Sequence, residues 1–153
     1  MQRGQQNYFQ TNFTTTFAET NVVGNIYFAN YVLWQGKCRE LFLAEFCPDV
    51  LQEIQSGLAL VTLDLSCTYL EQLHALEPVV MHMHLEAMTE SRALMAFEYF
   101  RREPGRLHLV CRSHQSVASM RAVDGVLQPV PFPPSIIESI QQYQLIAPGR
   151  SSP

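Results

Sequence analysis

The polar side chains best spaced for chemistry lie in residues 17–40, FAETNVVGNIYFANYVLWQGKCRE. Asn21 stands there in a turn between a strand-like segment and a long apolar one. Its amide can donate to a carbonyl oxygen or hold a water through its own oxygen, but it cannot act as a general base. The alternative is that Asn21 only caps the turn, which is a common role of asparagine. From spacing alone, both roles stay open.

Two charged residues flank this turn. Glu19 shares a strand face with the turn if the strand extends that far, and it could be a base or a plain surface carboxylate. Arg39 falls on the side of Phe28–Val32 in an otherwise apolar helical segment. A guanidinium in such surroundings needs an anion or a polar partner. The alternatives are a head group that reaches water, or an ion pair with Glu40 or Glu45.

Other reactive residue types give weaker signals. His82 and His84 have a metal-like spacing on one strand face, but no third ligand is evident, so we expect exposed histidines and no metal site. No G-x-S-x-G motif appears, which argues against an α/β-hydrolase. Four cysteines without CxxC spacing lie in apolar segments and are expected to be reduced core residues: Cys38, Cys47, Cys67 and Cys111.

The bulk properties bound the class of protein. The chain has 153 residues, 47% of them hydrophobic, which fits one globular domain with a sizeable core. Its net charge of −4 argues against nucleic acid as a partner. No apolar run approaches the roughly 20 residues that span a bilayer. Because the first residues lack the apolar core of a signal peptide, we expect a cytoplasmic protein that does not bind membranes.

Periodicity predicts one domain over residues 8–146, with loose segments at 1–7 and 147–153. A strand over Tyr8–Thr20 precedes a helix over Asn25–Phe46, whose apolar positions leave only a narrow wet side. Ser135 and Glu138 form a possible capping box at the start of a final helix. Between the two helices lie four strand-like runs: Leu58–Leu70, Pro78–Met88, Arg92–Arg102 and Arg106–Arg121.

The order β–α–β–β–β–β predicts an α+β fold in which a curled antiparallel sheet wraps one long apolar helix. In that arrangement the helix buries its wide apolar arc and each strand buries one face. This is the hot-dog fold. Hot-dog subunits usually pair edge to edge into one continuous sheet, which removes an exposed strand edge.

The segment FAETNVVGNIYFANY resembles the signature of the 4-hydroxybenzoyl-CoA thioesterase type of hot-dog protein, which has an acidic-Thr-Asp triplet, a glycine turn and Tyr/Phe-x-x-Tyr. NVVGNIYFANYVLWQGKCRE is more similar to the thioesterases of enediyne polyketide biosynthesis. The resemblance extends from about Tyr8 to Ile146 and is most specific over residues 19–40. The broad family carries a catalytic aspartate where this chain has Asn21. The enediyne subgroup shares the amide and pairs it with the helix arginine, here Arg39.

The resemblance implies thioester hydrolysis, in which water attacks and an oxyanion must be stabilised, without metal or organic cofactor. Backbone N–H groups of Val23–Ile26, at the predicted helix start, would form the oxyanion hole. The residues implied as catalytic are Asn21, Arg39, Gly24 and Asn25. Those implied to bind substrate are Glu19, Val23, Tyr27, Tyr31 and Thr62.

The implied substrate is a linear polyene β-keto acyl chain on the phosphopantetheine arm of a carrier domain in an iterative polyketide synthase. The released β-keto acid would be prone to decarboxylation. The alternatives are an acyl-CoA thioesterase of the same fold and a non-hydrolytic acyl-binding module. The implied assembly is a homodimer, or a homotetramer built as a dimer of dimers. The arginines near the last hairpin could meet the carrier or simply face solvent: Arg92, Arg101, Arg102, Arg106 and Arg112.

Helix geometry sets a constraint on this site. Arg39 lies about 14 residues beyond a helix start near Asn25, which is roughly 20 Å along the axis. An arginine side chain reaches only about 6–7 Å, so a straight helix keeps Arg39 away from its own oxyanion hole. The helix could begin later or kink at Gly36, or the site could be shared with a second subunit. We favour the shared site.

Overall fold

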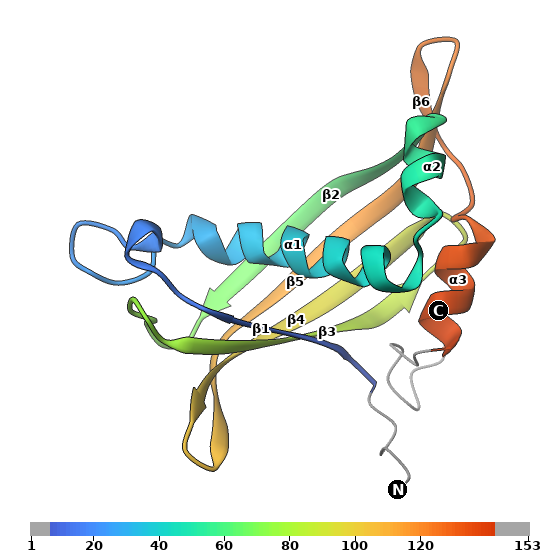
Figure 1. Cartoon of the computed structure of the whole chain (residues 1–153). Helices are drawn as coiled ribbons and strands as arrows, with labels where there is room; N and C mark the ends of the chain where they lie inside the picture. Colours follow the sequence, from blue (N-terminus) through green and yellow to red (C-terminus); the bar gives the residue numbers. More distant parts are fainter. Residues whose placement is uncertain (1–6, 143–153) are drawn as a thin grey trace, which may run out of the picture.

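The structure is a computed structural model, and it describes residues 7–142. The predicted order β–α–β–β–β–β is confirmed, and the short elements η1, α2 and β6 add to it (Figure 1). The elements in chain order are β1 (Phe9–Thr14), η1 (Phe17–Glu19), α1 (Ala29–Phe46), α2 (Val50–Gln55), β2 (Leu58–Tyr69), β3 (Pro78–Met88), β4 (Arg92–Glu103), β5 (Arg106–Val123), β6 (Val126–Pro129) and α3 (Pro134–Gln142).

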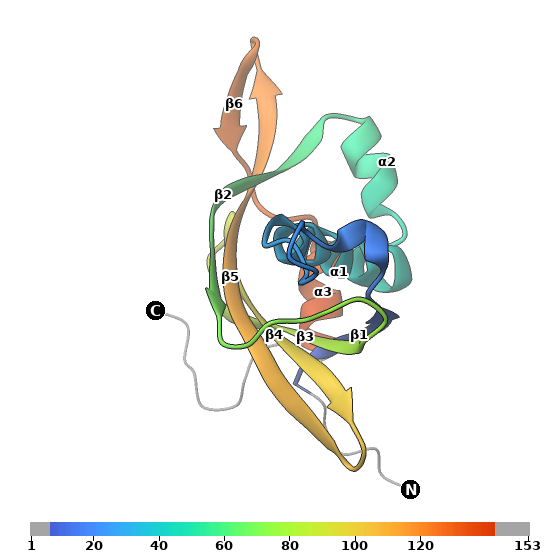
Figure 2. The same cartoon turned by 90° about the vertical axis from the view of Figure 1, so that its left-hand side faces the viewer.

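The strands form one antiparallel sheet in the order β1-β3-β4-β5-β2, with β6 paired to the end of β5. Figure 2 shows this sheet curled around α1, as the hot-dog prediction requires. Side chains alternate between the two faces of each strand, and those that face α1 make the core. Met81 and Met83 of β3 and Phe97 and Tyr99 of β4 are all at most 2% exposed.

Register shifts interrupt this alternation in three strand pairs, β2–β5, β3–β4 and β4–β5, and the shift in β2 bears on the candidate site. In the pairing of β2 with β5, Thr62 lies opposite Val117 and Cys67 lies opposite Ser113, but the register shifts between Thr62 and Asp64. The extra residue is Leu63, which makes a β-bulge. Thr62 and Cys67 therefore both face α1, although they are five residues apart.

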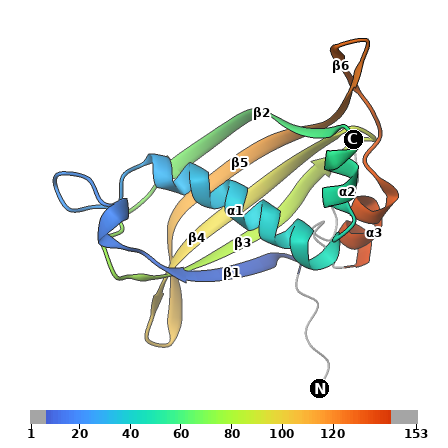
Figure 3. The ribbon, with the colours of Figure 1, turned by 45° about the horizontal axis from the view of Figure 1, so that its top comes forward.

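Helix α1 begins at Ala29 rather than near Asn25, so the predicted start is wrong by about one turn. The helix continues unbroken through Gly36, which excludes the kink (Figure 3). The solvent-exposed side of α1 is wider than predicted, since Leu33 is 68% exposed. The side chains buried against the sheet are Tyr31, Trp34, Gln35, Cys38 and Phe42.

Strand β1 ends at Thr14, six residues earlier than predicted. The cause is a capping box around η1, in which the Thr16 N–H and hydroxyl both donate to the Glu19 carboxylate, at 2.9 and 3.1 Å. The sequence carries this signal as T-x-x-E, which stops the strand in favour of a turn. The residues just before the candidate site are therefore coiled rather than extended.

Three further expectations need correction or stay outside the described part. Helix α3 begins at Pro134, so Ser135 lies inside the helix and does not cap it. His82 is 9% exposed and stacks on Tyr8 at 3.8 Å between ring centroids, so it is not the expected exposed histidine. The predicted tail at 147–153, the domain end at 146 and all but the last residue of the segment 1–7 lie outside the described residues. Among the helices between residues 7 and 142, none has the length and apolar character to cross a membrane.

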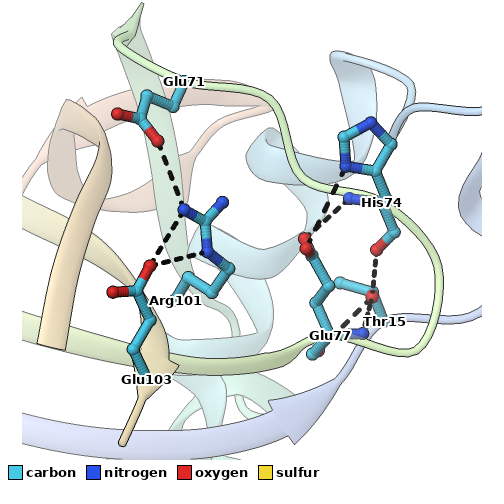
Figure 4. A network of polar contacts seen from close by, with 6 residues as sticks. All are labelled: Thr15, Glu71, His74, Glu77, Arg101 and Glu103. Atoms are coloured by element: carbon cyan, nitrogen blue, oxygen red, sulfur yellow. Dashed lines mark hydrogen bonds and ion pairs between the residues drawn. The ribbon is translucent and has the colours of Figure 1, made fainter. Parts of the chain in front are cut away.

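The turn that follows β1 is anchored by one buried hydroxyl (Figure 4). Thr15 is fully buried, donates from Oγ1 to the His74 carbonyl at 2.6 Å and accepts the Glu77 N–H at 2.9 Å. The Glu77 carboxylate in turn accepts the His74 N–H at 2.8 Å. These bonds tie the start of η1 to the loop between β2 and β3, and so fix the base of the loop over residues 20–26.

This anchor gives a stability prediction. Thr15→Val keeps the shape but leaves the His74 carbonyl and the Glu77 N–H without their hydroxyl partner. The free energy of unfolding should fall by about 2–4 kcal/mol, because each unpaired buried group costs roughly 1–3 kcal/mol. Urea denaturation measures this loss. Thr14→Val, at the exposed end of β1, is the matched control and should stay within about 0.5 kcal/mol. Equal effects of the two changes would contradict the anchoring role.

Candidate active site

The loop over residues 20–26 is a tight hairpin organised by Asn21. The Asn21 N–H donates to the Asn25 carbonyl at 2.8 Å, and the Gly24 N–H donates to the Asn21 carbonyl at 3.0 Å. Asn21 Oδ1 accepts the Val23 N–H at 3.0 Å, while Gly24 has a φ of +91° that favours glycine. Asn21 thus does cap the turn. Within the described residues its Nδ2 makes no hydrogen bond, so a donor remains for a ligand.

The backbone donors lie elsewhere than predicted. The N–H groups of Val23 and Gly24 are used inside the hairpin, and that of Ile26 donates to the Leu73 carbonyl at 2.8 Å. Since α1 begins at Ala29, with Phe28 as its N-cap, the first N–H groups of the helix are those of Phe28 and Ala29. The position at which the helix dipole favours an anion is therefore at Phe28 and Ala29, and not at Val23–Ile26.

Glu19 is held by its neighbours on the β1 side of α1. Besides its bonds to Thr16, its carboxylate accepts the Trp34 indole N–H at 2.9 Å. The Glu19 carbonyl accepts from the Tyr27 N–H at 2.9 Å and from Asn30 Nδ2 at 2.8 Å. With both carboxylate oxygens used, Glu19 acts in this chain as a clamp that joins η1 to α1.

Arg39 lies on the opposite, β2 side of α1. Its Nη1 donates to Gln115 Oε1 at 2.9 Å and lies 3.5 Å from Thr62 Oγ1, so the structure places Thr62 beside Arg39. Its Nε is buried without a hydrogen-bond partner within the described residues. Burial lowers the pKa of the guanidinium, which the Glu40 carboxylate partly opposes. Arginine nevertheless keeps its charge at neutral pH, so an unpaired cationic donor faces this side.

An apolar cavity of about 60 Å³ adjoins Arg39, between α1, α3 and the concave face of the sheet. Arg39 and His84 also line it, but the surface that faces the cavity is entirely apolar, so Arg39 contributes its hydrocarbon stem there. Such a lining suits a hydrocarbon group. The lining includes Phe42, Met83, Met95, Val117, Phe132 and Ile136.

The chain does not bring Asn21 and Arg39 together. Arg39 lies ten residues after Ala29, which is about 15 Å along the helix axis. The hairpin loop that carries Asn21 projects beyond the start of α1, at the blue end of Figure 1. One subunit therefore presents two separate groups of candidate residues. We call them the hairpin half-site (Asn21, Phe28, Ala29) and the arginine half-site (Arg39, Thr62).

The two candidate tyrosines occupy different environments. Tyr27 is 47% exposed beside the hairpin half-site. Tyr31 is 2% exposed, and burial raises the pKa of its phenol to about 12. The Tyr31 carbonyl accepts the Tyr99 hydroxyl at 2.7 Å, as part of the core. Tyr31 thus supports the helix, whereas Tyr27 is open to a ligand.

The hairpin arginines are partly neutralised inside the chain. Arg101 pairs with Glu71 at 3.3 Å and with Glu103 at 3.1 Å (Figure 4), and Arg106 pairs with Glu103 at 2.7 Å. The exposed members of the predicted set are Arg92, Arg102, Arg106 and Arg112, of which Arg106 is the one paired with Glu103. No cluster of three or more metal-binding side chains occurs among residues 7–142.

Comparison with known families decides the class of protein. The profile of the thioesterase-like superfamily matches residues 15–140. The chain belongs to this thioesterase-like superfamily. It is a thioester hydrolase with the hot-dog fold. Crystal structures of the dynemicin thioesterase, solved to show polyene binding, share 38% identity, cover 92% of this chain and 99% of that one, and superpose with a TM-score of 0.85.

More distant thioesterases share the fold alone. The 1,4-dihydroxy-2-naphthoyl-CoA thioesterase Slr0204 from Synechocystis is 16% identical, with a TM-score of 0.79 over 88% of this chain and 96% of that one. A 4-hydroxybenzoyl-CoA thioesterase in complex with 4-hydroxybenzoyl-CoA is 13% identical, with a TM-score of 0.77 over 88% of this chain and 99% of that one. No curated protein matches the sequence significantly.

Sequence reasoning missed two features of this thioesterase. The helix-start donors at Phe28 and Ala29 were misplaced because the helix start was predicted too early. Gln115 and Gln35, which link to Arg39, were not considered at all. Gln35 could have been noticed, since it lies one helical turn before Arg39 in an apolar segment. Gln115 is distant in sequence and gave no signal.

The hairpin geometry predicts the effect of restoring the aspartate of the broad family. In Asn21→Asp the carboxylate can still accept the Val23 N–H, so the turn should survive, but the Nδ2 donor is lost. We expect kcat to fall by about 10²–10³-fold, as when one oxyanion donor is removed, with an unchanged Tm. A free-thiol assay on an acyl thioester measures kcat. Asn12→Asp, on exposed β1, is the control, and an Asn21→Asp enzyme as fast as the parent would contradict the donor role.

Proposed function

We propose that this thioesterase hydrolyses a linear polyene β-keto acyl thioester from the carrier domain of an iterative polyketide synthase of the enediyne type. The observation that carries the proposal is the 38% identity, over 92% of the chain, with the dynemicin thioesterase, whose crystal structures concern polyene binding. The apolar lining of the cavity beside Arg39 is compatible with the end of a hydrocarbon chain, and its volume of about 60 Å³ means that a whole chain would need the cavity to widen.

In the proposed mechanism the thioester carbonyl lies between the two half-sites. Asn21 Nδ2 and the helix-start N–H groups of Phe28 and Ala29 donate to the oxygen as it becomes an oxyanion. Arg39 supplies positive charge from its guanidinium, whose Nη1 lies beside Thr62. Water attacks the carbonyl carbon, and the tetrahedral intermediate expels the pantetheine thiolate, which takes up a proton. The product is a β-keto acid, which is prone to lose carbon dioxide.

The distance between the half-sites within one chain is the reason to place the reaction between two subunits. Strand β2 is an edge of the sheet, and Leu63 and Leu65 on it are about 40% exposed. Val22, Val23 and Phe28 at the hairpin are also largely exposed. Apolar side chains beside an open strand edge favour burial by a second copy. We propose that one subunit contributes Asn21 and the other Arg39.

The proposed carrier specificity rests on charge. Phosphopantetheine is anionic and carrier domains are acidic, so an exposed cationic surface would guide docking. Arg101 and Arg106 are already paired within the hairpin, which leaves Arg92, Arg102 and Arg112 for this role.

A thioester panel tests the substrate. The purified enzyme should hydrolyse a polyene β-keto acyl group on a carrier domain with a higher kcat/KM than the same acyl group on coenzyme A. The product is followed by polyene absorbance and mass. Equal or higher kcat/KM on the coenzyme A thioester would favour an acyl-CoA thioesterase. Binding of the polyene without release of free thiol would contradict hydrolysis altogether.

Complementation tests the shared site. Asn21→Ala and Arg39→Ala chains should each be nearly inactive alone. A heterodimer of the two holds one intact composite site and one doubly altered site, so it should recover about half of the parental activity. Two affinity tags isolate the heterodimer. Tagged Asn21→Ala homodimers are the control. Confirmed heterodimers that stay as inactive as either parent would place both residues in one subunit's site.

A further inference from the structure

Three hydrogen bonds link Arg39 to Cys67 through two buried glutamines. Arg39 Nη1 donates to Gln115 Oε1 at 2.9 Å, Gln115 Nε2 donates to Gln35 Oε1 at 3.3 Å, and Gln35 Nε2 donates to Cys67 Sγ at 3.2 Å. Gln35 is fully buried and Gln115 is 4% exposed. The path runs from α1 to β5, back to α1 and then to β2, so it crosses the core under the helix.

The direction of this path is set at its arginine end. A guanidinium has only donors, so Gln115 must turn its oxygen toward Arg39. Its amide nitrogen then faces Gln35, so the Gln35 amide oxygen must accept this hydrogen bond. The Gln35 amide nitrogen is left to donate to Cys67. Each amide orientation therefore follows from the one before it, and the sulfur at the far end is an acceptor.

Cys67 sits among groups that suit an acceptor. The Cys111 thiol, on the neighbouring strand β5, is the main cause that lowers the Cys67 pKa to about 7; Tyr69 and Gln35 add to the effect and burial opposes it. The pKa of Cys111 is raised in turn by its bond to Cys67 and by burial. The other titratable groups around Cys67, from α1, β2 and β4, are Tyr31, Tyr69 and Tyr99.

We propose that Gln115 and Gln35 are positioning residues of this thioesterase. Their two amides hold the Arg39 guanidinium in one orientation, and they couple that orientation to the hydrogen bond that the Cys67 sulfur accepts. The part of the proposal that concerns catalysis rests on the proposed role of Arg39. With Nη1 held by Gln115, the guanidinium plane cannot swing freely, and Nη1 stays beside Thr62. Preorganised charge of this kind lowers the cost of stabilising an oxyanion.

The test compares two changes of one residue. Gln115→Met removes both hydrogen bonds at similar volume, so Arg39 loses its acceptor and Gln35 can turn its oxygen toward Cys67. Both kcat and the alkylation rate of Cys67 should then fall. Gln115→Glu returns an acceptor to Arg39 but offers no donor to Gln35. It should therefore restore kcat while alkylation of Cys67 stays slow.

The readouts are kcat by free-thiol release and alkylation of Cys67 by iodoacetamide at pH 7, mapped by peptide mass. The Gln35 donor helps to lower the Cys67 pKa, so losing it raises this pKa and slows alkylation at pH 7. We expect kcat of Gln115→Met to fall by about 10–100-fold, the worth of one hydrogen bond to a charged group. Thermal melting verifies that each variant is folded. Gln52→Met, on the exposed face of α2, is the control for both readouts.

The outcomes separate this inference from the proposed function. Unchanged alkylation of Cys67 in Gln115→Met, or a parental Cys67 no more reactive than buried Cys38, would overturn the coupling. A Gln115→Glu enzyme as slow as Gln115→Met would overturn the positioning of Arg39. If Arg39→Ala hydrolyses thioesters normally while Gln115→Met slows alkylation, the catalytic role of Arg39 fails and the coupling stands.

Discussion

The sheet-facing side of α1 must be buried, and it carries polar groups that need partners inside the core. Gln35 is completely buried, and Arg39 is partly buried. The curled sheet supplies one hydrogen-bond partner to each, because Gln115 on β5 faces the helix at the level of these two side chains. A buried polar group without a partner would cost more than most single apolar contacts supply. The fit of α1 to the sheet is therefore set by hydrogen bonds as well as by volume.

One helix carries two different groups of candidate residues along its length. Its first turn offers unsatisfied N–H groups and a positive dipole end, whereas its middle holds a cation beside an apolar cavity. The two positions are separated by a fixed rise per residue, and no side-chain movement can close that gap. If one thioester carbonyl must contact both the helix-start N–H groups and Arg39, a second copy of the helix in a partner subunit can supply one of the two.

Much of this could be predicted from the sequence, because the strongest signals were local. The alternation of the strands, the apolar period of α1 and the turn at Asn21 are properties of neighbouring residues, and they led to the fold and to the candidate residues. The helix start was misplaced because residues 25–28 are as apolar as the helix itself, so composition gave no boundary. The contact between Gln115 and Arg39 could not be foreseen, since 76 residues separate them and only strand register brings them together.

The bulge at Leu63 has a consequence for parity along β2. In a regular strand, residues five apart point to opposite faces, yet Thr62 and Cys67 both face the helix because one extra residue lies between them. Deleting Leu63 would remove the bulge and leave Thr62 and Cys67 four residues apart in a regular strand, so both would still face α1. Deleting one residue between Asp64 and Cys67 instead, with the bulge kept, would turn either the cysteine or the threonine away from α1. The number of residues between Asp64 and Cys67 is therefore part of the site's specification, whereas the extra residue of the bulge is not.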